Sequence, residues 1–161
     1  MKLSTREDMA VPVEVAFDAI SDFEEFERRA MRRGADVSRT DPPSGPGLGS
    51  TWDATFSFRG KQREIVAEME LFDPPNSILL RSRVGGLRAV FDVTLVALSP
   101  QKTRMVVGLE FTANNLSARL LVQSLKLAKA SLSKRFERAV SEFAVGVERA
   151  HKGVQPGVTL G

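Results

Sequence analysis

The feature that most constrains the fold is a run of alternating apolar and polar residues across the middle of the chain. Between Trp52 and Phe111, apolar residues recur with a period of two in five separate segments. This is the pattern of β-strands that have one buried and one solvated face. Because only short turns separate the segments, each strand must pair with the next in the antiparallel sense. The sequence therefore predicts a five-stranded antiparallel meander.

Proline and glycine residues mark the turns of this meander. The turns are Gly60-Lys61, Asp73-Pro74-Pro75-Asn76, Gly85-Gly86 and Ser99-Pro100-Gln101-Lys102. Proline cannot join a ladder inside a sheet, and paired glycines permit the positive φ angles of a tight hairpin. The phase of each strand then predicts an inner apolar face, which includes Leu71 at the end of the second segment.

Shorter elements are predicted before the meander. A strand occupies residues 3–9, and Pro12 suits the first turn of a helix. Ser21 followed by Glu24 is a capping-box pattern, which predicts a second short helix that ends at Gly34. A short strand around Val37 leads to a loop rich in proline and glycine.

A long helix is predicted after the meander, because the hydrophobic period changes to three or four residues from Leu116 to about Ala150. Asn114 and Asn115 are candidate N-caps. At 1.5 Å per residue the helix would run roughly 50 Å. It is longer than any predicted strand, so we expect it to bend, split or overhang the sheet. Residues 1–152 are predicted to form one domain, and residues 153–161 a flexible C-terminal tail.

These elements predict an α+β fold in which a curved antiparallel sheet wraps around the long C-terminal helix, with two short N-terminal helices closing one end. A one-sided sheet must bury its apolar face. Where the helix fails to reach that face, we expect an apolar cavity, which is the usual form of a ligand site. The alternative is a fully packed core. The expected ligand-binding residues are Trp52, Phe56, Phe58, Met69, Leu80, Ser82, Phe91, Met105, Leu109 and Leu125.

Composition narrows the class of protein. The chain has 161 residues, no cysteine and a formal net charge of +3. It has no stretch of about 18 apolar residues that would span a membrane. The lack of cysteine is typical of a reducing compartment, so we expect a cytoplasmic protein. Acids interleave with the bases, and aromatic residues do not alternate with the arginines as in single-strand nucleic-acid sites, so no nucleic-acid partner is expected.

Three stretches of the chain resemble one known superfamily. They are residues 11–22, which look like its first helix, the Gly47-Leu48-Gly49-Ser50-Thr51-Trp52 entry into a long strand, and the Asp73-Pro74-Pro75 break between strands. Together with the element order, they resemble the START-like, polyketide cyclase-dehydrase-like (SRPBCC) superfamily with its helix-grip fold. The resemblance implies a pocket for a lipid-, polyketide- or quinone-like molecule. Some relatives catalyse cyclisation or dehydration. The superfamily has no shared catalytic motif, so the resemblance implies no catalytic residue in this sequence.

Catalytic groups are sparse. His151 is the single histidine, tyrosine is absent, and no metal-binding or nucleophile motif occurs, so no catalytic residue, metal or cofactor is expected. Arg63 is in phase with Ile65 and is predicted at the pocket mouth, where it could pair with a ligand carboxylate. An exposed strand-end arginine is the alternative.

Three functions follow from these patterns. The first is binding or carrying a small hydrophobic molecule, and the second is a cyclase or dehydratase that uses the same cavity. The third is an interaction module, with transient membrane contact, that uses the basic face from Arg28 to Arg33. Glu24 and Glu25 lie four residues before Arg28 and Arg29, so intrahelical ion pairs are an alternative explanation of that face. The lack of convergent catalytic residues favours binding over catalysis, and the oligomeric state is not predicted.

Overall fold

The computed structural model describes residues 1–154. Within these residues, seven strands form one antiparallel sheet in the order β1-β7-β6-β5-β4-β3-β2. In chain order the elements are β1 (Lys2–Met9), α1 (Val13–Ile20), α2 (Phe23–Arg32), β2 (Asp36–Thr40), β3 (Thr51–Phe58), β4 (Lys61–Asp73), β5 (Ser77–Val84), β6 (Leu87–Ser99), β7 (Lys102–Ala113), α3 (Leu116–Leu127) and α4 (Lys129–Val154). The predicted α+β class and five-stranded meander, which is β3 to β7, are confirmed.

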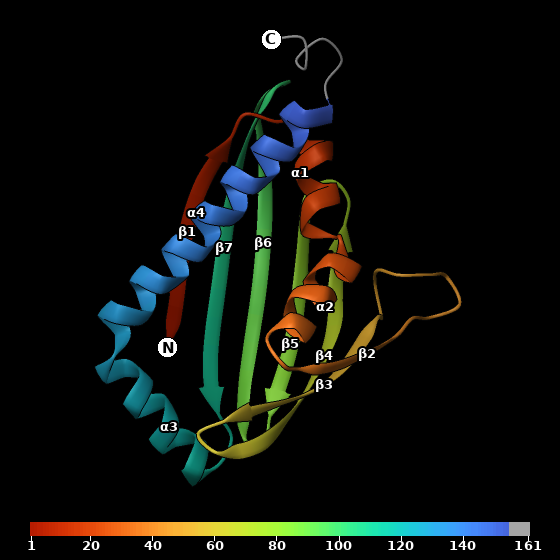
Figure 1. The fold of residues 1–161 in the computed structure, drawn as a ribbon. Coiled ribbons are helices and arrows are strands. Elements are labelled where there is room, and N and C mark those ends of the chain that lie inside the picture. The colour runs from red at the N-terminus through yellow and green to blue at the C-terminus, as the bar shows by residue number, and fades with distance from the viewer. Residues whose placement is uncertain (155–161) are drawn as a thin grey trace.

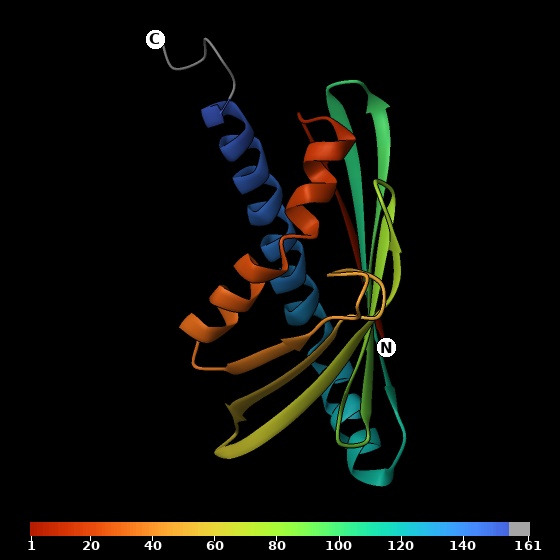
Figure 2. The ribbon, with the colours of Figure 1, turned by 90° about the vertical axis from the view of Figure 1, so that its right-hand side faces the viewer.

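The sheet is curved, and the helices cover its concave face. Figure 1 looks onto that face, which α4 crosses diagonally while α1 and α2 lie over the other half. In the view turned by 90°, α1, α2 and α4 lie on one side of the sheet, and β2, β3 and β4 curl toward them (Figure 2). The sheet therefore grips the helices instead of lying flat beneath them.

A β-bulge in β4 changes which side chains face the helices. The register of β4 with β5 shifts between Met69 and Leu71, so that Met69 pairs with Leu80 and Leu71 with Leu79. Leu71 consequently points outward and is 43% exposed. Phe72 takes the inner position and packs against the core. The predicted inward position of Leu71 is thus wrong, because a strict period of two does not survive the extra residue of a bulge.

The C-terminal helix is divided at Ala128. Asn115 caps α3, because its Oδ1 accepts a hydrogen bond of 2.8 Å from the Ala118 N–H. The Ala128 N–H donates to the Leu125 carbonyl, and α4 begins at the next residue. Of the three outcomes expected for this helix, a bend, a split or an overhang, the structure shows a split. Helix α4 includes Gly153 and Val154, and the rest of the predicted tail lies outside the described residues.

The start of α2 also differs from the prediction. Asp22 is its N-cap and accepts a hydrogen bond of 3.3 Å from the Glu25 N–H. Ser21, predicted as the cap, instead donates through its Oγ to the Phe17 carbonyl at 2.7 Å. Ser21 thereby closes α1, and Asp22 opens α2 one residue later.

One end of the helix–sheet interface is tightly packed. Met9, Val11, Phe17 and Met105 are all at most 4% exposed in the core that α1, α4 and the sheet share. The buried Thr103 Oγ donates to the Val11 carbonyl at 2.9 Å, so the polar group here is also satisfied. This end fixes how α1 and α4 sit on the sheet. Within residues 1–154, no helix is both long and apolar enough to cross a membrane.

Candidate ligand-binding site

An open cavity of about 550 Å³ lies between the concave face of the sheet and helices α2 and α4. Strands β2 to β7 supply its floor, and α4 contributes Phe136, Ala139, Val140 and Phe143. Its volume is within the range of roughly 300–1,000 Å³ typical of small-molecule sites. The lining is almost entirely apolar, and only Glu27 and Arg29 bring charged groups to it.

The placement of the helices explains why this space stays open. Helix α4 lies along β1, α1 packs on β6 and β7, and α2 packs on the edge strand β2. Helix α2 contacts the inner faces of β3 and β4 through Phe23, whose ring centroid lies 5.2 Å from that of Trp52 and 6.1 Å from that of Phe72. These strands curl toward the helices (Figure 2), and the cavity is the space left between their inner faces and α4.

Five of the predicted ligand-binding residues line the cavity. They are Trp52, Met69, Leu80, Phe91 and Met105, which come from five consecutive strands. Met69 and Met105 are almost fully buried, so they form the floor of the cavity.

The other predicted residues do not line this cavity. Phe58 is 43% exposed at the end of β3. Phe56 pairs with Arg63 beyond the cavity lining of β3 and β4. The residues predicted for the site but placed outside its lining are Phe56, Phe58, Arg63, Ser82, Leu109 and Leu125. Phe56, Phe58 and Arg63 lie toward the β3–β4 turn and Leu125 lies on α3, whereas Leu109 lies within β7 opposite the cavity residue Phe91.

Sequence reasoning missed the residues that the helices contribute. Phe26 of α2 stacks on Phe143 of α4, with ring centroids 5.7 Å apart, and both side chains line the cavity. Phe136 and Phe143 belong to the apolar stripe of the C-terminal helix. That stripe was the available signal, but it did not indicate which turns of the helix lie over open space.

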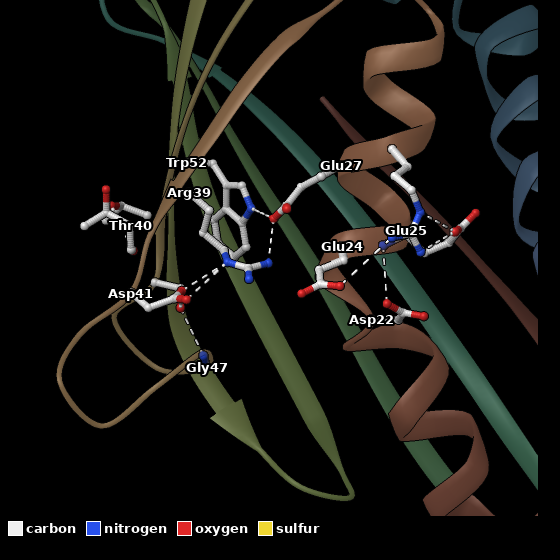
Figure 3. Close-up of polar contacts among 12 residues, drawn as sticks. Asp22, Glu24, Glu25, Glu27, Arg39, Thr40, Asp41, Gly47 and Trp52 are labelled. Carbon is white, nitrogen blue, oxygen red and sulfur yellow. Dashed lines mark hydrogen bonds and ion pairs between the residues drawn. The ribbon is translucent and has the colours of Figure 1, made fainter.

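A buried polar network closes the cavity between α2 and β3 (Figure 3). Trp52 Nε1 donates to Glu27 Oε2 at 2.8 Å, and Arg39 Nη1 donates to the same oxygen at 2.7 Å. The side chains of Arg39 and Glu27 are only 15% and 17% exposed. Because a charge this poorly hydrated needs a partner, the carboxylate ties α2 to β2 and β3.

The network continues from Arg39 into the loop after β2. Arg39 Nε donates to Asp41 at 3.3 Å, and Ser50 Oγ donates to the same carboxylate at 2.8 Å. The Gly47 N–H donates to Ser50 Oγ at 3.0 Å. These hydrogen bonds hold the proline- and glycine-rich loop against the rim of the site. Each of them joins two groups of the protein itself.

Three arginines of the basic face of α2 are ion-paired within the helix. The Glu25 carboxylate contacts Arg28 at 2.9 Å and both Arg29 and Arg32 at 3.3 Å. Hydrogen bonds from Arg28 and then Arg29 lower the pKa of Glu25. Glu24 also reaches Arg28, at 4.0 Å. The predicted pairs Glu24–Arg28 and Glu25–Arg29 are therefore present.

Arg63 differs from these paired arginines. Its Nε atom is buried and has no hydrogen-bond partner among the described residues. Arg63 pairs with Phe56 across the ladder and precedes Ile65, a cavity-lining residue, by two positions. Successive residues of a strand alternate between faces, so Arg63 lies on the same concave face as Ile65.

Two acids on the strands that line the cavity turn away from it. Asp53 is exposed and alternates with the cavity residues Trp52 and Ala54. Asp92 lies beside Gly108 on the outer face, since its neighbours Phe91 and Val93 line the cavity. Within residues 1–154, no cluster of three or more histidine, cysteine, aspartate or glutamate residues could hold a metal ion.

Comparison with known proteins gives structural matches only. No family model matches the sequence. No curated protein matches it either. A crystal structure of a Thermus thermophilus protein is 16% identical, with a TM-score of 0.65, and the match covers 93% of this chain and 99% of that one.

Two further matches have names that describe an activity. The Zhui aromatase/cyclase from a Streptomyces species is 13% identical, with a TM-score of 0.63 and coverage of 92% of this chain and 94% of that one. A point mutant of norcoclaurine synthase from Thalictrum flavum is 12% identical, with a TM-score of 0.66 and coverage of 94% and 96%. The chain therefore has the helix-grip fold of these proteins, as the sequence predicted.

Proposed function

We propose that this helix-grip protein binds one small hydrophobic molecule in the cavity between the sheet and helices α2 and α4. The observation that carries the proposal is the cavity itself, with a volume of about 550 Å³ and an almost wholly apolar lining. An apolar surface left in contact with water costs roughly 25 cal/mol per Å². A hydrophobic guest would remove that cost by displacing the water.

The chemistry of the lining supports a lipid-, polyketide- or quinone-like guest. Aromatic rings come from both layers, with Trp52 and Phe91 on the sheet and Phe136 on α4. Flat or elongated apolar groups would fit between them. Glu27, the carboxylate of the lining, is already bonded to Trp52 and Arg39. It therefore serves to position the wall of the site.

A cyclase or dehydratase activity has less support. Such a reaction needs an acid or base directed at the guest, and Asp53 and Asp92 lie on the outer face of the sheet. The names of two structural neighbours describe enzymes. At 13% and 12% sequence identity, however, these matches support a shared fold and not a shared activity. The hypothesis of a protein- or membrane-interaction module built on α2 also has less support, because Arg28, Arg29 and Arg32 form ion pairs with Glu25.

The proposal is tested by titrating delipidated protein with the neutral fluorophore N-phenyl-1-naphthylamine. We expect saturable enhancement of fluorescence with a stoichiometry of one probe per chain. The variant Ala139→Trp, which places a large ring in the cavity, should abolish it. The control Ala150→Trp changes an exposed position of the same helix and should bind like the wild type. Non-saturable binding, or equal binding by Ala139→Trp, would contradict the proposal.

A further inference from the structure

Arg63 is a partly buried arginine whose Nε donor is not satisfied by the described residues. Its Nε is shielded from solvent and lacks a partner among residues 1–154. A buried donor without an acceptor usually costs about 1–3 kcal/mol, and more when the group is charged. Native proteins seldom keep such a group without a reason, and an acceptor supplied from outside the chain is one of the ordinary explanations.

No acid is adjacent to Arg63 on its own face of the β3–β4 ladder. Its cross-strand neighbour is Phe56, and Phe58 pairs with Lys61 one step further along the same face. Toward the middle of the sheet the next inner residue is Ile65. Its neighbours on this face of the ladder are therefore apolar side chains and a second cation, and none of them is an acceptor for the Nε donor.

The position of Arg63 relates it to the cavity. Ile65 and its cross-strand partner Ala54 both line the cavity, and Arg63 lies two residues before Ile65 on the same face of β4. Two strand residues span about 7 Å. A guest seated over Ile65 and Ala54 would therefore need to extend only a few atoms to reach the guanidinium.

The two polar ends of the site differ in what they can still bind. At the α2 end, Glu27 is paired with Arg39 and Trp52. At the β3–β4 end, Arg63 Nε is unpaired among the described residues. A guest with a polar head would therefore gain more by placing an acceptor at Arg63 than by approaching the occupied carboxylate. Arginine binds carboxylates through charge-assisted hydrogen bonds that are about twice as strong as neutral ones.

We propose that the natural ligand is an amphipathic monoanion, with its apolar body in the cavity and a carboxylate, or a head group of the same charge and shape, bound to Arg63. The proposal rests on the proposed hydrophobic-ligand function and specifies the class of molecule. It also assigns to Arg63 the role of a specificity-determining residue.

The test compares dodecanoate with methyl dodecanoate by isothermal titration calorimetry at pH 8, where the acid is ionised. We expect the wild type to bind the acid about tenfold to a hundredfold more tightly than the ester, the value of one charge-assisted hydrogen bond. In Arg63→Met the two affinities should converge while the affinity for the ester stays unchanged. Arg63→Lys should retain part of the preference, because it keeps the charge.

Arg83→Gln is the matched control, since it removes an exposed arginine from the outer face of β5. It should leave the preference for the acid intact. Equal binding of acid and ester by the wild type, or an undiminished preference in Arg63→Met, would overturn the role of Arg63 while leaving the hydrophobic site standing. If the wild type bound neither compound, both proposals would fail.

A second readout needs no ligand. The substitution Arg63→Met removes the unsatisfied donor and introduces an unbranched apolar side chain. The melting temperature of this variant should therefore equal or exceed that of the wild type. A marked loss of stability would show that Arg63 has a structural role inside the protein and would overturn the proposal.

Discussion

The two ends of the helix–sheet interface use the same kinds of residue to opposite effect. Near α1, Met9, Val11 and Phe17 interlock with Met105 and leave almost no exposed surface. Under α2, Trp52 and Leu80 face open space of about 550 Å³. The difference shows that the helices, and not the strands, decide where this fold has a core and where it has a cavity.

The largest difference in stability between the two regions is expected when an aromatic side chain is truncated in each of them. Phe17 is 4% exposed and packs edge-on against Phe72 at 5.3 Å, so Phe17→Ala should lower the free energy of unfolding by about 3–5 kcal/mol. Phe136 already borders the cavity, and Phe136→Ala should cost less than half as much. Urea denaturation measures both values. Equal losses would mean that the cavity is as tightly packed as the core.

Removing the carboxylate between α2 and β3 should have the next largest effect. Glu27→Ala leaves Trp52 Nε1 and Arg39 Nη1 without their acceptor, so it should destabilise the protein by about 1–3 kcal/mol. Glu24→Ala is the control, because the Glu24 side chain is 70% exposed. If both variants had the same unfolding midpoint, the network would not be what secures this wall of the cavity.

Enlarging a small side chain should change the free energy of unfolding in opposite directions in the two regions. Ala16 is fully buried, and Ala16→Leu should destabilise the packed end by about 1–3 kcal/mol. Ala54 faces the cavity, so Ala54→Leu should leave the free energy of unfolding unchanged or raise it slightly. The same variant should weaken binding of the neutral fluorophore. Thermal denaturation and the probe titration together check both expectations, and destabilisation by Ala54→Leu would contradict the open geometry.

The smallest effect is expected at a surface ion pair outside both regions. Arg104 donates to Asp8 at 2.8 Å and lowers the pKa of that carboxyl. A lowered pKa stabilises the folded state above the unfolded pKa of about 4, and the contribution disappears as the pH falls through the folded value. Asp8→Asn should therefore lower the melting temperature slightly at pH 6 and by less at pH 3. An equal effect at both pH values would exclude this ion pair as its cause.

The sheet could be predicted from the sequence because a period of two is a local pattern. The strands around Trp52, Phe91 and Met105 have the predicted inner faces. The bulge beyond Met69 could not be predicted, since an extra residue reverses the phase without altering composition. Leu71 accordingly points to solvent, and Phe72 takes its place.

The site could be predicted only in part, because a cavity depends on the distance between layers. The strand residues Trp52 and Leu80 were identified from their phase. The contribution of Phe26 and Phe143 required knowing where α2 and α4 cross, which is a tertiary property. The link from Glu27 to Trp52 spans 25 positions of sequence, and no local pattern indicates it.

The most direct measurement of the central claim is a crystal structure of delipidated protein soaked with 1-bromonaphthalene. The bromine atom can be located by anomalous scattering without prior assumptions about the density. The account predicts one strong anomalous peak enclosed by Leu80, Phe91 and Phe136. Side chains that close over this space, with no peak inside it, would contradict the existence of a ligand cavity.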